Sequence, residues 1–123
     1  MYILNLNSHN VSYIILLYAI FQANFGEVKR VETIATQGRP SRAYAQWVTS
    51  YKFAYSVTDV EPYIFTLDPA CNEKVFDGNT DQNSVVNHDL ETTVEARCVR
   101  LYPQTWEAHI SLRWEVYGCD VGN

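Results

Sequence analysis

The stretch CVRLYPQTWEAHISLRWEVYGC, residues 98–119, decides the fold of this 123-residue chain. Its second half alternates the apolar residues Ile110, Leu112, Trp114 and Val116 with Ser111, Arg113, Glu115 and Tyr117. Side chains that alternate with a period of two lie on opposite faces of a β-strand. The stretch therefore predicts a half-buried strand over 109–118, with its apolar face turned toward a core.

The same alternation occurs in WVTSYKFAYSV, residues 47–57. Shorter strand candidates cover residues 28–36, 63–67, 74–76, 84–87 and 95–102. Turn-forming sequences separate them, namely QGRPS, TDVEP, DPACN and DGNTDQN. No window shows a helical period with capping residues. Seven short strands separated by turns predict an all-β antiparallel sandwich or barrel.

Composition and charge narrow the class of protein. With 47% hydrophobic and 14% aromatic residues, the chain has the composition of one packed domain. The net charge of -5 divides unevenly. Residues 1–57 carry five Lys/Arg and two acids, giving +3, whereas residues 58–123 carry four Lys/Arg and twelve acids, giving -8. An acidic domain does not favour nucleic acid as a partner, but the first half leaves room for a local basic loop.

The amino end contains an apolar run, VSYIILLYAIF, at residues 11–21. Its length is that of a signal-peptide core and is too short to span a bilayer. The preceding residues include no Lys or Arg, which a signal peptide normally carries. The run fits a strand or a buried helix as well, and these interpretations remain open.

Three cysteines, Cys71, Cys98 and Cys119, make an odd number. In a secreted protein this indicates a free thiol, an intermolecular bond or a missing partner. No CxxC or HxxxH pair occurs in the chain, so we expect no metal site and no cofactor.

Four segments taken together resemble one known family. They are FGEVKRVETIATQGRP (25–40), WVTSYKFAYSVTD (47–59), KVFDGNTDQNSVVNHDL (74–90) and EARCVRLYPQTWEAHISLRWEVYGC (95–119). In order and spacing they resemble the discoidin domain, also called the coagulation factor V/VIII type C domain. The resemblance implies a discoidin-like jelly-roll β-sandwich or barrel, similar to galactose-binding domains. We expect a partial, N-terminally truncated discoidin-like domain over 21–119, after a divergent segment at 1–20 and before a tail at 120–123.

The amino end departs from the family. Its members begin with a cysteine and a portion rich in Gly and Trp, where this chain has MYILNLNSHNVSYIILLYAI. A third interpretation of residues 1–20 is thus a replaced or wrongly predicted segment. The family's disulfide joins its first cysteine to the one that matches Cys119, so the expected partner of Cys119 is missing. Cys71 and Cys98 could pair with each other or remain reduced and buried, and both alternatives stay open.

The resemblance places ligand contacts on loops at one end of the barrel. The matching loop here is GRPSRAYAQWV, residues 38–48, and its candidate ligand-binding residues are Arg39, Arg42, Tyr44 and Trp47. Amphipathic rings suit a membrane interface or a sugar face, and guanidinium groups pair with phosphate or carboxylate. Trp47 could instead pack beneath the loop as the first core residue of the next strand.

The loop DGNTDQN spaces Asp77, Asn79, Asp81 and Asn83 like calcium ligands. However, Gln82 and His88 occupy the positions where an EF-hand needs Gly and Glu. We therefore expect these residues to cap a tight turn.

Polar residues on the later strands receive structural interpretations as well. We expect Arg97, Arg100 and Arg113 to form ion pairs with Glu95, Glu107 or Glu115. We expect His109 to be a buried hydrogen-bonding group.

No catalytic motif is present, and the family consists of binding modules, so we do not expect an enzyme. The resemblance implies an extracellular module, secreted or part of an ectodomain, that serves cell adhesion. Its partner would be a cell-surface glycan, an extracellular protein or an anionic phospholipid membrane surface. The alternatives are an incomplete domain without independent activity and a carbohydrate-binding accessory of a larger secreted protein.

Overall fold

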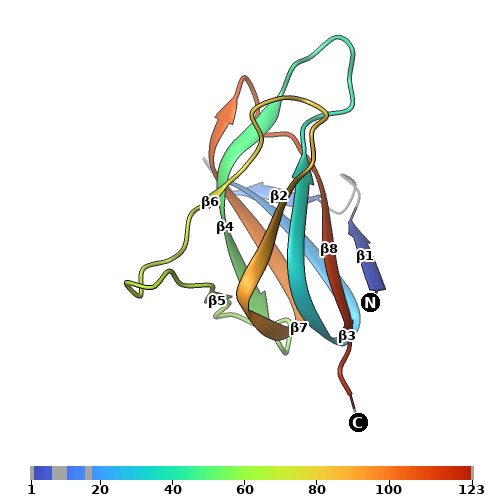
Figure 1. Ribbon diagram of the computed structural model, residues 1–123, viewed down its shortest axis with the longest axis vertical. Coiled ribbons are helices and arrows are strands. Elements are labelled where there is room, and N and C mark those ends of the chain that lie inside the picture. The colour runs from blue at the N-terminus through green and yellow to red at the C-terminus, as the bar shows by residue number, and fades with distance from the viewer. Residues whose placement is uncertain (1, 7–10, 16–17, 123) are drawn as a thin grey trace.

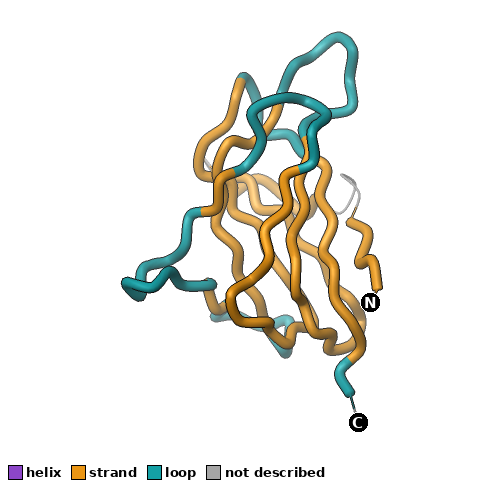
Figure 2. The backbone as a smooth tube through the Cα atoms, in the orientation of Figure 1, coloured by secondary structure: helices purple, strands orange, loops and turns teal. Residues whose placement is uncertain are grey.

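Eight antiparallel β-strands make up the fold in a computed structural model that describes residues 2–6, 11–15 and 18–122. They are β1 (Tyr2–Leu6), β2 (Val11–Ile15), β3 (Tyr18–Gln37), β4 (Trp47–Ser56), β5 (Ile64–Phe65), β6 (Phe76–Asp77), β7 (Val86–Glu107) and β8 (Arg113–Asp120). The predicted all-β antiparallel class is confirmed (Figures 1 and 2). In the described segments no helix is long and apolar enough to cross a membrane.

Two long strands, β3 and β7, run through both layers of the sandwich. Residues 21–24 of β3 pair with 98–101 of β7, and residues 29–36 of β3 pair with 86–96 of β7. Between these arms β3 turns at Gly26, which has φ +81° and donates its amide to Asn24 Oδ1 at 2.8 Å. Glycine adopts this left-handed conformation without steric cost. The bend carries the sheet over onto itself, and the two faces enclose the core (Figure 1).

The remaining strands attach to this pair. On one layer β8 pairs with β3, and β1 pairs with β8. On the other layer β2 pairs with β3, β4 pairs with β7, and the short strands β5 and β6 pair with β4. Residues 84–87 and 95–102, expected to be separate strands, therefore belong largely to one strand, β7, because its pairing with β3 resumes at Val94 after residues 90–93 leave it.

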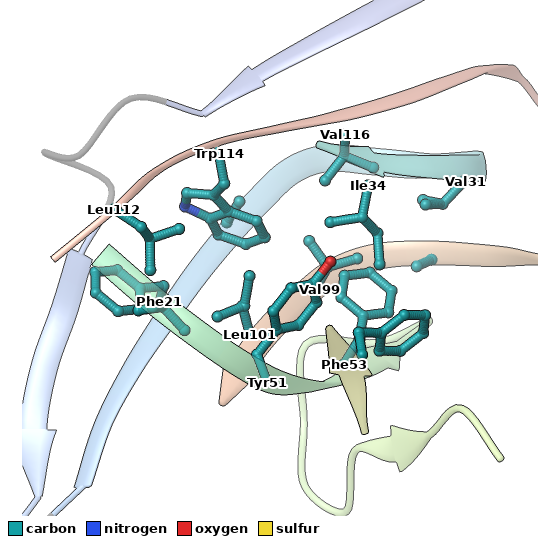
Figure 3. Packing of buried hydrophobic residues seen from close by; sticks show 14 residues of the cluster. Phe21, Val31, Ile34, Tyr51, Phe53, Val99, Leu101, Leu112, Trp114 and Val116 are labelled. Atoms are coloured by element: carbon teal, nitrogen blue, oxygen red, sulfur yellow. The ribbon is translucent and has the colours of Figure 1, made fainter. Parts of the chain in front are cut away.

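The core contains the apolar faces that the alternation predicted. Leu112, just before β8, and Trp114 and Val116 of β8 are each no more than 2% exposed, and they face Tyr51 and Phe53 of β4 across the sandwich (Figure 3). Their alternating neighbours, Ser111, Arg113, Glu115 and Tyr117, are half-buried on the other face. The predicted buried face is confirmed, but the strand begins at Arg113 and not at residue 109, because residues 108–112 form the connection from β7.

The backbones of β3 and β8 approach each other closely at Gly118. This residue pairs with Val31, and a Cβ placed on it would lie 1.8 Å from the carbonyl oxygen of Arg30. No side chain fits there unless the strands separate. At Gly122, by contrast, no atom beyond the neighbouring residues lies within 4 Å of the position that a Cβ would take.

Replacing Gly118 should destabilise the sandwich. We expect Gly118→Ala to lower the free energy of unfolding by about 3 kcal/mol, since the added methyl forces the backbones of β3 and β8 apart. This corresponds to a Tm roughly 10 °C lower in a thermal melt followed by circular dichroism. Gly122→Ala is the matched control and should melt like the parent chain. Equal melting of both variants would contradict the close approach.

All three cysteines are free thiols in the structure. Cys98 is buried in a small cluster with Ala54 and Tyr63, and burial raises the pKa of its thiol to about 11. Cys71 is exposed on the turn after β5, at φ +65°. Cys119 is half-buried, with its Sγ 3.6 Å from Glu32 Oε1.

These environments predict selective thiol labelling. Under native conditions dithionitrobenzoate should modify Cys71 rapidly and should reach Cys98 only after unfolding, since the thiolate is the reacting species. Cys71→Ser should remove the fast phase, and Cys98→Ser should leave it unchanged. A Cys71–Cys98 disulfide in non-reducing peptide maps would contradict this assignment.

Candidate functional site

The loop between β3 and β4, residues 38–46, lies beside the loop between β6 and β7, residues 78–85, at one end of the sandwich (Figure 1). The turn at 57–62 lies at the opposite end (Figure 1). Both neighbouring loops are anchored by groups on the adjoining strands. We refer to the first as the 38–46 loop.

The 38–46 loop is closed by its own hydrogen bonds. The amide of Arg39 donates to the carbonyl oxygen of Gln46 at 2.9 Å. Near the tip, Ser41 Oγ accepts from the amides of Ala43 at 3.1 Å and Tyr44 at 3.3 Å. A short polar side chain thus satisfies backbone donors that a turn leaves without partners.

Gln82 fastens the 38–46 loop to its neighbour. Its Nε2 donates toward the carbonyl oxygens of Arg39 at 2.6 Å and Tyr44 at 3.3 Å, and also toward that of Ser41. The approach is close, because a Cβ on Gly38 would lie 2.9 Å from Gln82 Cα. One amide group therefore contacts the backbone of the loop at three residues.

Arg113 supports both loops from β8. Its Nε donates to the carbonyl oxygen of Gly38 at 2.8 Å, and its Nη2 donates to Gln82 O and Asn83 Oδ1, each at 3.2 Å. The expectation of a carboxylate partner for Arg113 is wrong. The planar guanidinium instead bonds three oxygens in the two loops and holds them together.

Arg100 also departs from the expected pairing. It is 9% exposed, forms an ion pair with Glu61, and donates from Nε to Gln22 Oε1 at 2.7 Å. Its guanidinium carbon lies 3.8 Å from the centroid of the Tyr63 ring. The predicted partners Glu95, Glu107 and Glu115 are wrong for Arg100, because the 57–62 turn folds across β7 and brings Glu61 to it.

The 78–85 loop is a capped turn. Asp81 accepts hydrogen bonds from Ser84 Oγ at 2.6 Å, from the Ser84 amide at 2.7 Å and from the Asn83 amide at 3.1 Å. These donors, the Ser84 hydroxyl foremost, hold the pKa of Asp81 below its ordinary value. Asn79 is buried and donates to the carbonyl oxygens of Thr36 and Ser84. The predicted turn-capping role is confirmed for Asp81 and Asn79, whereas the Asn83 side chain accepts from Arg113.

No group of three or more His, Cys, Asp or Glu residues suited to a metal ion occurs among the described residues. Asp77 lies on β6 opposite Ser50, apart from the turn that Asp81 caps.

The structure places the four predicted ligand-binding residues along one loop. Tyr44 is 55% exposed at the tip, and Arg42 is exposed beside it. Arg39 is half-buried, with its guanidinium carbon 4.7 Å from the centroid of the Tyr44 ring and its Nη1 3.1 Å from Gln46 Oε1. Trp47 is half-buried at the start of β4, opposite Glu107. Tyr44 and Arg42 therefore lie at the tip, the Arg39 guanidinium reaches the Tyr44 ring from the closed base of the loop, and Trp47 lies where the loop joins β4.

Sequence reasoning missed an aromatic residue at this end. Trp106 is 42% exposed and pairs with Val48, next to Trp47. The alternation of 98–119 gave no reason to separate it from the core residues of the same segment.

His109, expected to be buried, is exposed in the turn after Ala108, which has φ +64°, so that expectation is wrong.

Loss of the Gln82 amide should loosen the 38–46 loop. We expect Gln82→Ala to speed tryptic cleavage after Arg42 by about fivefold, because opening the loop then costs roughly 1 kcal/mol less. Trypsin does not cleave after Arg39, because Pro40 follows it. Within the 38–46 loop, cleavage after Arg42 is therefore the measure of loop opening. Gln104→Ala, which removes an exposed amide bonded only within β7, is the control. Equal cleavage of both variants would show that Gln82 does not hold the loop.

Comparison with known proteins finds a matching family model and relatives of similar sequence. A family model for the F5/8 type C domain matches residues 8–116. Discoidin-2 of Dictyostelium discoideum is 37% identical over 99 residues, covering 80% of this chain and 36% of discoidin-2. Lactadherin of Bos taurus is 39% identical over 99 residues, covering 80% of this chain and 23% of lactadherin. The chain thus spans little more than a third of the first relative and less of the second.

Solved structures agree on the fold. Recombinant discoidin II of Dictyostelium discoideum superposes with a TM-score of 0.75 at 34% identity, over 91% of this chain and 42% of that chain. CpGH89CBM32-6, produced by Clostridium perfringens, superposes with a TM-score of 0.52 at 13% identity, over 91% of this chain and 79% of that chain, a likeness of fold alone. The predicted jelly-roll β-sandwich is confirmed.

Proposed function

Because the chain belongs to the F5/8 type C domain family, we propose that it is an extracellular ligand-binding module of cell adhesion. Its 38–46 loop would contact a cell-surface glycan, a protein or an anionic phospholipid. The observation that carries this proposal is the exposed Tyr44 ring, with the Arg39 guanidinium against it, on a loop fixed by Gln82.

The chemistry of the tip suits a ligand with an anionic group beside an apolar or sugar face. The 38–46 loop contains Arg39 and Arg42 and no acidic residue. A guanidinium donates two parallel hydrogen bonds to a phosphate or carboxylate. The Tyr44 ring supplies an amphipathic surface that stacks on a sugar or enters the headgroup region of a membrane.

The hydrogen bonds within and below the loop support a binding role for it. Ser41, Gln82 and Arg113 hold its backbone in one path. A loop that is ordered before binding loses little conformational entropy when the ligand arrives. The tip side chains can therefore contribute their contact energy to affinity.

Removing the tip side chains should weaken binding. We expect the double variant Tyr44→Ala, Arg42→Ala to bind at least about tenfold more weakly, because it loses the exposed ring and an exposed cation together. Two assays separate the ligands, namely vesicle sedimentation across a series of phosphatidylserine contents and a glycan array. Binding to an anionic group should also fall between low salt and about 0.5 M salt.

Val60→Ala serves as the control, since Val60 is 63% exposed and belongs to the 57–62 turn, which lies at the opposite end of the sandwich. If the double variant kept the full affinity of the parent chain in every assay that detects binding, the 38–46 loop would not be the site.

A further inference from the structure

A hollow of about 440 Å³ lies on the side of the sandwich, away from the 38–46 loop. One wall is β5 with the residues that follow it, and the other is the bend of β7, which lies beside β5 in Figure 1. The rings of Tyr55, Phe65 and Phe76 line it, together with Leu90 and Val94. We call it the side groove. Its volume is in the range of sites that hold a ligand or a short peptide segment.

The groove exists because two strand edges fail to meet. At the bend, Glu32 of β3 lies opposite four residues of β7, 90–93, which leave the pairing with β3. No strand of the described chain pairs with these four residues. Across from them β5 is only two residues long. Core side chains therefore reach the surface between the two edges.

Apolar side chains continue beyond the floor of the groove. Ile64 and Leu67, which line it, are 56% and 52% exposed, and neighbouring Val75 is 52% exposed. Single exposed aliphatic residues are ordinary, but several around one hollow mark a contact surface. Burying them against a partner would remove apolar area from water.

Charge defines the partner further. Glu91 and Glu95 line the groove and are exposed, and within the described chain neither has an ion-pair partner. Lys74 is the only cation among the described lining residues, and its Nζ lies 4.9 Å from the centroid of the Phe76 ring. The two carboxylates thus favour a cation brought by the ligand.

We propose that the side groove docks an extended segment of a protein partner. Aliphatic side chains of the segment occupy the hollow, and a Lys or Arg of the segment pairs with Glu91 and Glu95. The unpaired backbone of residues 90–93 offers hydrogen bonds to an added strand. An anionic membrane is disfavoured by the same carboxylates, and a second copy by the net charge of -5 that each copy carries. This surface is separate from the 38–46 loop and does not depend on its role.

The test is an NMR titration of the ¹⁵N-labelled chain with two capped heptapeptides of alternating valine and threonine. One peptide ends in lysines and the other in glutamates. We expect the lysine peptide to shift the amides of 64–67 and 90–95, to leave those of 38–46 in place, and to bind at least about tenfold more tightly than the glutamate peptide. Added salt should reduce this preference.

Charge-neutral variants locate the contact. Glu91→Gln with Glu95→Gln should lose most of the preference for lysine, and Glu107→Gln, an exposed acid outside the groove, should keep it. Thermal melts check that each variant is folded. Three results would overturn the proposal: equal affinity for both peptides or none, shifts confined to other surfaces, or a concentration-dependent dimer or vesicle contact that occupies 64–67 and 90–95.

Discussion

The pairing of β3 with β7 is the constraint on which the other elements depend. Each strand bends and belongs to both layers, so backbone hydrogen bonding on either side of the bends joins the two layers in addition to side-chain packing. β8 and β2 attach to β3, and β4 attaches to β7. The register of this one pair therefore sets which side chains enter the core, since a shift of one residue would exchange the faces of a strand.

The same pair of strands also holds the end of the sandwich that carries the 38–46 loop. The second arm of β3 leads into Gly38, and β8, which lies along that arm, carries Arg113 to the carbonyl oxygen of Gly38. The 78–85 loop leads directly into β7, so Gln82 reaches the 38–46 loop from the other side. The backbone of the 38–46 loop is thus held by groups that the scaffold places, while Tyr44 and Arg42 project from it. This division leaves the tip side chains free to differ without changing the fold.

Sequence reasoning succeeded where the signal is local. The alternation around Trp114 identified the buried face of β8, and the polar spacing around Asp81 identified a capped turn, because both depend on neighbours in the chain. It failed for Arg100, and it gave no expectation for residues 90–93, which leave the pairing of β7 with β3, because both depend on which distant segments meet. Glu61 reaches Arg100 only after the 57–62 turn folds across β7, and no periodicity encodes that contact. The exposure of Trp106 has the same origin, since it depends on where β7 ends relative to β4.

The uneven charge along the chain becomes an uneven charge on the surface. The arginines of the 38–46 loop come from the half with a charge of +3, whereas Glu91 and Glu95 of the side groove come from the half with -8. These groups lie on separate surfaces of the fold. Glu91 and Glu95 lie at the bend of β7, whereas the arginines lie in the 38–46 loop, which follows β3. A ligand attracted by one surface is disfavoured by the other, so the two can select partners of opposite charge. The same arrangement explains how an acidic domain can present a basic tip: the attraction acts over about a Debye length, and the acids of the side groove lie on a different face of the molecule.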